Sequence, residues 1–137
     1  MNSLNLVGRV SHETELKEVG KGDKKTMMLR NVLAVVDNYN REKTNFIPFT
    51  MFGKTAENFH KVVDKGDLIG LANAEMKADN YENKDGDKRT FYYALTSNWQ
   101  LYRKKNDNND KQENNSKSVK EEIAENENDF DENDLPY

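Results

Sequence analysis

Five strand-like segments and one helical stretch constrain the fold of this chain more than any other feature. Each segment is rich in aliphatic, β-branched or aromatic residues and is bounded by polar or turn-forming residues. We predict strands over residues 2–10, 26–36, 45–52, 67–77 and 90–102. Between the third and fourth strands, Ala56, Phe59 and Val63 have the spacing of one helix face, which predicts a helix over residues 55–64.

Five strands with one helix between the third and fourth is the element order of an OB-fold, a partly open β-barrel used to bind oligonucleotides. We therefore predict an all-β body, built as a five-stranded OB-fold barrel with that single helix. The polar segment 81–89 contains Asp85-Gly86, which is a turn signal, and we expect it to be a hairpin loop.

A change in composition near Arg103 marks the end of this body. Residues 1–105 carry 18 basic and 14 acidic side chains, a net charge of +4, whereas residues 106–137 carry 3 and 11, a net charge of −8. The second part has too few apolar side chains to offset the entropy of ordering it. We predict a folded domain over 1–105, a disordered linker over 106–128 and an acidic tip over 129–137.

The strand predicted over residues 45–52 carries aromatic residues on both faces. Because side chains alternate along a strand, Phe49 and Met51 belong to a continuous apolar face that suits a core. Phe46 and Phe52 fall on the opposite face, with a proline and a threonine between them. Two outward phenylalanines are costly for solubility unless something covers them. A barrel core or subunit interface accounts for these two as well as a ligand contact does.

Basic and further aromatic residues are interleaved around these two phenylalanines. The set comprises Tyr39, Arg41, Lys54, Tyr81, Lys88 and Arg89. A nucleic-acid single strand requires such a mixture, because its unpaired bases stack on aromatic rings and its phosphates need cations. Taken alone, Tyr39 and Tyr81 fit ordinary loop tyrosines better.

The only tryptophan is predicted to be a core residue. Trp99 has the same parity along the last predicted strand as a set of apolar residues. That set is Phe91, Tyr93, Leu95 and Leu101. Because the whole set forms one apolar face, we expect it to lie in the core rather than at a binding surface.

The residue inventory indicates neither an enzyme nor a cofactor. The chain has no cysteine, which excludes disulfides, thiolate zinc sites and a cysteine nucleophile. His12 and His60 have no metal-ligand spacing, and there is no glycine-rich phosphate loop, so we expect no metal and no catalytic residue. The N-terminus lacks a signal-peptide pattern and no apolar run is long enough to span a membrane. We expect a cytoplasmic protein without membrane contact.

Short motifs in a consistent order and spacing carry a resemblance to a known family. They are Leu6-Val7-Gly8-Arg9-Val10, Leu33-Ala34-Val35, Phe52-Gly53-Lys54-Thr55-Ala56-Glu57, Lys65-Gly66-Asp67, Tyr81-Glu82-Asn83-Lys84-Asp85-Gly86 and the terminal Asp134-Leu135-Pro136-Tyr137. Together they resemble the bacterial single-stranded-DNA-binding protein family, which includes phage-encoded members. The family's acidic tip usually ends in Asp-Leu/Ile-Pro-Phe, so a terminal tyrosine is a small departure.

That resemblance implies an OB-fold that binds single-stranded DNA largely without sequence specificity, commonly as a homotetramer. It also implies protection of single strands during DNA replication, recombination and repair. The positions that match the family's base-stacking aromatics are Tyr39, Phe46, Phe52 and Tyr81, and Lys54 lies inside a matched motif. Weaker candidates for phosphate contact are Arg9, Arg41, Lys61, Lys88 and Arg89.

The acidic tip has an implied role of its own. Apolar and acidic residues are mixed there: Phe130, Asp131, Glu132, Asp134, Leu135, Pro136 and Tyr137. Such a mixture suits a partner pocket with an apolar floor and a basic rim. The family uses this tip to recruit replication, recombination and repair proteins. A solubilising tail is the simpler interpretation of the charge alone.

Three positions depart from the family pattern. Thr14 replaces a common proline, Ala74-Glu75 stands where Gly-Arg is usual, and Pro48 falls where a basic residue is common. Pro48 also lacks a backbone N–H, which predicts a sheet edge or a bulge. These departures leave the DNA path and the subunit geometry open, and they suggest a divergent phage or plasmid member.

Three rival functions follow from the same residues. The first is an RNA-binding or replication-restart module, the second is a metal-dependent nuclease acting on single strands, and the third is an acidic DNA mimic. The basic body argues against the mimic, and the scattered carboxylates of the body argue against the nuclease.

Overall fold

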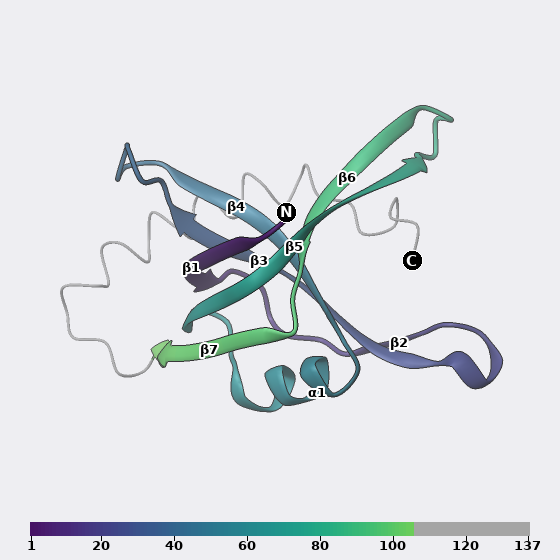
Figure 1. Ribbon diagram of the computed structural model, residues 1–137, viewed down its shortest axis with the longest axis horizontal. Coiled ribbons are helices and arrows are strands. Elements are labelled where there is room, and N and C mark those ends of the chain that lie inside the picture. Colours follow the sequence, from purple (N-terminus) through teal and green to yellow (C-terminus); the bar gives the residue numbers. More distant parts are fainter. Residues whose placement is uncertain (106–137) are drawn as a thin grey trace.

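The computed structural model describes residues 1–105, and the linker and tip predicted over 106–128 and 129–137 lie outside the described residues. Strands dominate the described part, with one α-helix and one short 3-10 helix (Figure 1). The elements are β1 (Leu4–Val10), β2 (Lys17–Val19), η1 (Gly22–Lys24), β3 (Thr26–Val36), β4 (Thr44–Phe52), α1 (Gly53–Val62), β5 (Leu68–Glu82), β6 (Lys88–Leu95) and β7 (Asn98–Arg103).

Five of the strands close into a ring. β1 pairs with β3, β3 with β4, β4 with β6 and β6 with β5, and β5 returns to pair with β1. In chain order the ring strands are β1, β3, β4, β5 and β6, and α1 lies between the third and the fourth. The predicted five-stranded, OB-fold-like architecture with one helix is thus confirmed. The short β2 pairs with β3, and β7 pairs with β5.

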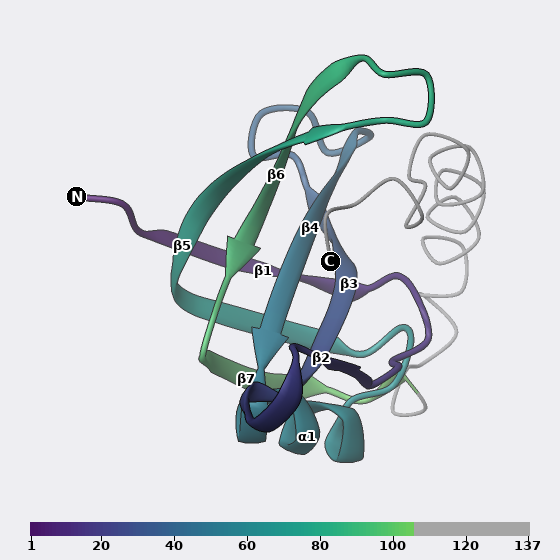
Figure 2. The same ribbon diagram turned by 90° about the vertical axis from the view of Figure 1, so that its right-hand side faces the viewer.

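α1 covers one end of the barrel (Figures 1 and 2). A chain of three aromatic rings joins the helix to the strands at that end. Phe49 of β4 meets Phe59 of α1 edge to face, with ring centroids 5.7 Å apart. Phe59 meets Trp99 of β7 in the same way at 5.2 Å. The predicted helix stripe of Ala56, Phe59 and Val63 is fully buried, and Trp99 packs against the core as expected. The apolar face of the helix therefore closes the barrel.

The transition from β4 to α1 is abrupt because Gly53 adopts a φ of 63°. A residue with a side chain rarely takes that conformation, whereas glycine does so at little cost. Phe52 is consequently both the last residue of β4 and the N-cap of α1, and the helix begins two residues earlier than predicted. Lys54 is thereby the second residue of the helix.

The single strand predicted over residues 90–102 is wrong, because the chain breaks there into β6 and β7. The Thr96 hydroxyl donates to the carbonyl oxygen of Asn98 at 3.0 Å and accepts from its N–H at 3.3 Å. This local turn changes which face the odd-numbered residues occupy. Trp99 and Leu101 pack against the central core cluster, whereas on β6 the even-numbered Ala94 belongs to that cluster.

The β5–β6 hairpin is longer than the sequence predicts. β5 extends to Glu82 and β6 begins at Lys88, so both ends of the loop predicted over 81–89 are strand and 83–87 form the turn. This hairpin and the β3–β4 hairpin project from the end of the barrel opposite α1 and diverge from each other (Figures 1 and 2).

Candidate nucleic-acid interface

Phe46 and Phe52 share the outward face of β4. Across the sheet they lie opposite Ala34 and Met28 of β3, while Phe49, on the alternate face, is a core residue. Both outward rings are half-buried, so part of each remains open to a ligand. The strand alternation read from the sequence therefore places these two rings on the outer surface of the barrel wall.

Pro48 lies at a local sheet edge, as its missing N–H predicts. It is paired with Val32 of β3 on one side. On the other side, the register between β4 and β6 covers only Phe49 and Thr50. Proline at this position costs no ladder hydrogen bond on the open side, and the two strands separate from there toward the hairpin tips.

Asp37 organises the loop that carries Tyr39 and Arg41. One carboxylate oxygen accepts hydrogen bonds from the N–H groups of Tyr39 and Asn40 at 2.9 and 3.0 Å, and the other accepts from the Asn45 side chain at 3.1 Å. These backbone and side-chain hydrogen bonds hold the pKa of Asp37 below its ordinary value. The Tyr39 side chain, by contrast, is fully exposed. The loop thus presents a free aromatic ring on an ordered backbone.

Tyr81 and Arg89 lie directly opposite each other on the β5–β6 hairpin and share one face. Lys88 lies opposite Glu82, on the other face. The turn is held by the Asn83 side-chain oxygen, which accepts from the N–H groups of Asp85 and Asp87 at 3.1 and 2.9 Å. Of the two predicted cations, Arg89 is therefore the one that accompanies an aromatic candidate.

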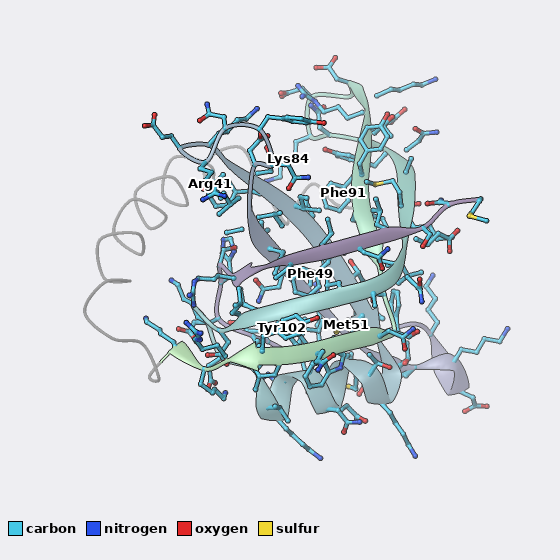
Figure 3. All side chains as sticks on the ribbon, turned by 60° about the vertical axis from the view of Figure 1, so that its left-hand side comes forward. Arg41, Phe49, Met51, Lys84, Phe91 and Tyr102 are labelled. Atoms are coloured by element: carbon cyan, nitrogen blue, oxygen red, sulfur yellow. The ribbon has the colours of Figure 1, made fainter. Side chains whose placement is uncertain are left out.

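The face of Tyr81 and Arg89 is continuous with the outward face of β4. Thr50 of β4 lies beside Leu95 of β6, and alternation along β6 places Phe91 and Arg89 on that same side. The aromatic candidates of β4 and of the β5–β6 hairpin thus belong to one surface. Figure 3 shows Arg41 beside the β3–β4 hairpin and Phe91 beside β6, whereas Phe49 and Met51 lie within the barrel.

The sequence interpretation placed Phe91 and Tyr93 in the core with Trp99. Tyr93 is indeed buried, at 4% exposure, whereas Phe91 is half-buried and is the functional candidate that the interpretation missed. Their rings are stacked, with centroids 5.5 Å apart and planes 22° apart. Neither packs against the core cluster. The run Thr96-Ser97-Asn98 carried the missed signal, because such residues favour turns and a turn there resets the strand parity.

The three remaining basic candidates differ in their positions. Arg9 of β1 lies opposite Ala34, at the side of the outward face, and its Nη1 donates to the Gly66 carbonyl oxygen at 2.9 Å. Burial, together with Arg103, lowers the pKa of Arg9, while Asp67 opposes that shift. Lys54 is exposed in the first turn of α1. Lys61 lies in the last turn, so the fold does not bring it beside either hairpin tip (Figure 1).

Glu75, where the family pattern has a cation, also lies on the outward face, opposite Leu95. Its carboxylate forms an ion pair with Lys77 two residues along β5, with 3.3 Å between Oε1 and Nζ. The exposed pair neutralises both charges locally. A phosphate held at this point would therefore meet no net positive charge.

The two histidines are occupied in structural contacts. His12 Nδ1 is hydrogen-bonded to the Ser11 hydroxyl at 2.7 Å, and His60 Nδ1 to the Thr14 hydroxyl at 2.8 Å. Among residues 1–105, no three histidine or carboxylate side chains are grouped so that they could hold a metal ion. Within that same part of the chain, no helix is long and apolar enough to cross a membrane.

Comparison with known proteins finds matches to single-strand binding proteins. The sequence model of the Single-strand binding protein family matches residues 1–102. The chain is 29% identical over its whole length to a "Single-stranded DNA-binding protein" of Staphylococcus aureus strain N315, covering 99% of that protein. It is 30% identical to "Single-stranded DNA-binding protein 1" of S. aureus strain Mu50, over 82% of this chain and 72% of the relative. It is 32% identical to "Single-stranded DNA-binding protein 1" of Clostridium acetobutylicum, over 65% of this chain and 82% of the relative.

Proposed function

The chain belongs to the single-strand binding protein family, and we propose that it binds single-stranded DNA largely without regard to sequence and catalyses no reaction. The observation that carries this proposal is the shared outward face of β4 and the β5–β6 hairpin, which gathers aromatic rings and a cation on one surface. The proposed stacking residues are Tyr39, Phe46, Phe52 and Tyr81. The proposed phosphate contacts are Arg41, Lys54 and Arg89, with Lys88 on the opposite face of the hairpin and Arg9 and Lys61 at the margins.

The arrangement of this face supports selection of single strands over duplex. In a duplex the bases are stacked on one another and paired, so their faces are not free to meet protein rings. An unpaired strand that enters between the two diverging hairpins can turn its bases toward β4 while its phosphates face the basic side chains. Each stacked base contributes roughly 1–3 kcal/mol, and every base has a π-face, so affinity depends little on sequence.

The acidic tip extends the proposal to partner proteins. Its apolar anchors Leu135, Pro136 and Tyr137 follow Asp134 directly in the sequence. The proposed partners are proteins of DNA replication, recombination and repair that offer an apolar pocket with a basic rim. We place this activity in the cytoplasm of a bacterial cell or a phage-infected host, with the protein acting as a homotetramer.

A titration that compares three readouts tests the proposal. Fluorescently labelled oligo-dT and oligo-rU of equal length are titrated at low salt, and the dT sample is then incubated with magnesium and analysed for cleavage. We expect tighter binding of dT and an intact oligomer. Equal affinity for rU would favour an RNA-binding module, and fragments of dT would reveal a nuclease. Failure to bind dT would revive the acidic-mimic interpretation.

A further inference from the structure

The stacked pair of Phe91 and Tyr93 occupies the outward face of β6 next to the proposed DNA contacts. Register with β5 places Phe91 opposite Asp79 and Tyr93 opposite Lys77, on the face that also carries Tyr81 and Arg89. Toward the barrel, this face continues through Leu95 to Thr50 of β4. The pair therefore lies between the aromatic residues of β4 and the ring of Tyr81.

Tyr93 is the fixed member of the pair. Only 4% of its surface is exposed. Its hydroxyl donates a hydrogen bond to the Asp79 carboxylate at 2.8 Å, and its ring is stacked on Phe91. A ring that is buried, stacked and hydrogen-bonded has few alternative rotamers, so it acts as a rigid support for its neighbour.

Phe91 is the presented member. It is half-buried, like Phe46, Phe52 and Tyr81. It has no polar group, and support from Tyr93 lowers the entropy that it would lose on binding a ligand. The next residue, Tyr92, lies on the opposite face of the hairpin and is 60% exposed. The stacked arrangement is thus confined to the face that adjoins the proposed DNA contacts.

We propose that Phe91 is a further base-stacking residue, that Tyr93 is its positioning ring, and that Asp79 fixes Tyr93. The ligand is a nucleobase of single-stranded DNA, so this inference rests on the proposed function and extends the DNA path along β6. The strand would pass from β4 over Phe91 to Tyr81 and Arg89. The Asp79 carboxylate lies opposite Phe91 and would repel a phosphate. The DNA path at Phe91 therefore accommodates a base rather than a phosphate.

Replacement of Phe91 in the full-length chain tests the inference. Loss of one stacked base predicts that Phe91→Ala weakens oligo-dT binding by about 5- to 150-fold at fixed salt, whereas Phe91→Tyr retains most of the affinity. The slope of log affinity against log salt should not change, because no phosphate contact is removed. Tyr92→Ala, on the opposite face, is the matched control and should bind like the wild type.

A second measurement does not depend on the stability of a variant. Oligo-dT carrying 5-bromodeoxyuridine is irradiated with the wild-type protein, and the crosslinked peptides are sequenced. Crosslinking at Phe91 but not at Tyr92 supports the inference. If the wild type binds oligo-dT while Phe91→Ala binds equally well and Phe91 forms no crosslink, Phe91 is not a contact and the inference fails alone. If the wild type itself does not bind, the proposed function fails.

The positioning role of Tyr93 has its own readout. Tyr93→Phe removes the hydroxyl that donates to Asp79 but keeps the ring. We expect a loss of about 2- to 10-fold in the wild-type background, since the support for Phe91 loosens. In the Phe91→Ala background the same change should cost nothing further, because the supported ring is gone. An equal loss in both backgrounds would show that Tyr93 acts independently of Phe91 and would overturn its positioning role.

Discussion

The carboxylate of Asp67 and the ammonium group of Lys104 lie 2.9 Å apart, although 37 residues separate them in the chain. Asp67 is only 1% exposed and also accepts hydrogen bonds from the N–H groups of Asp64 and Lys105, at 2.8 and 2.9 Å. One buried carboxylate thus ties the segment after β7 to the turn between α1 and β5. We call this network of Asp67 with Asp64, Lys104 and Lys105 the clasp.

Asp67→Asn should destabilise the domain by about 1–3 kcal/mol, because a buried, charge-assisted hydrogen-bond network loses its charge. Urea unfolding followed by Trp99 fluorescence, at fixed protein concentration, measures the change. Asp64→Asn is the matched control: its carboxylate also meets Lys104, at 3.1 Å, but is 79% exposed. That change should cost less than about 1 kcal/mol. Equal effects of the two substitutions would contradict the clasp.

The same clasp predicts a pH dependence. Burial raises the pKa of Asp67, but hydrogen bonds from Asp64, Lys105 and Lys104 outweigh it and hold the pKa below its ordinary value. A carboxyl group with a depressed pKa stabilises the fold fully above the ordinary value of 3.8. This stabilisation is lost as pH falls through the lower, folded-state pKa. The Asp67→Asn variant should therefore approach the wild type in stability at acid pH.

Asp37 provides a test of the exposed loop. Asp37→Ala removes the acceptor for the N–H groups of Tyr39 and Asn40, so the loop must be ordered when DNA binds. We expect oligo-dT affinity to fall by about 2- to 10-fold. Glu42→Ala in the same loop removes an equal charge from an exposed side chain and serves as the control. Because loss of a negative charge alone favours DNA binding, tighter binding by both variants would refute a positioning role for Asp37.

Rings and cations on the proposed interface should differ in their salt response. Phe46→Ala and Phe52→Ala should each weaken oligo-dT binding by roughly 1–3 kcal/mol without changing the salt slope. Arg89→Ala should lower the magnitude of that slope by about 0.7, the value for one phosphate on a single strand. Affinities measured at four or more salt concentrations separate the two classes. A changed slope for the phenylalanine variants would indicate that they act indirectly on the basic residues.

The barrel wall was predictable where alternation is unbroken. Along β4, two-residue periodicity put Phe49 and Met51 on one face and Phe46 and Phe52 on the other, and the structure bears out this division. Periodicity alone left open whether the second face was also core. The burial of the apolar helix face was also predicted correctly from periodicity. In both elements a single period decides which side chains share a face, and no tertiary contact is needed to read it.

The β5–β6 hairpin was not predictable in the same way. Phe91 and Trp99 have the same parity in the sequence, yet they lie on different faces because the Thr96 hydroxyl closes a turn with Asn98 between them. A single side-chain hydrogen bond gives little signal in the sequence pattern. It nevertheless changes the face of the sheet on which every following residue lies. The true length of β5 was equally hidden, since its polar outer half is strand only through pairing with β6.

Deletion of residues 129–137 tests whether the acidic end competes with DNA for the basic body. Removing these acidic residues should tighten oligo-dT binding by about two- to five-fold at low ionic strength. The difference should vanish at high salt, where charges are screened. Fluorescence anisotropy of full-length and truncated protein measures both conditions. Unchanged affinity at low salt would count against competition by the tip.

The most direct test of the central claim is a titration of labelled oligo-dT against a duplex of equal length at two salt concentrations. Rings that stack on unpaired bases predict tight binding of oligo-dT and weak binding of the duplex. The affinity for oligo-dT should fall with salt, with a slope of about −0.7 per neutralised phosphate. Equal affinity for the duplex, or no binding of oligo-dT at low salt, would contradict the assignment of this surface to single-stranded DNA.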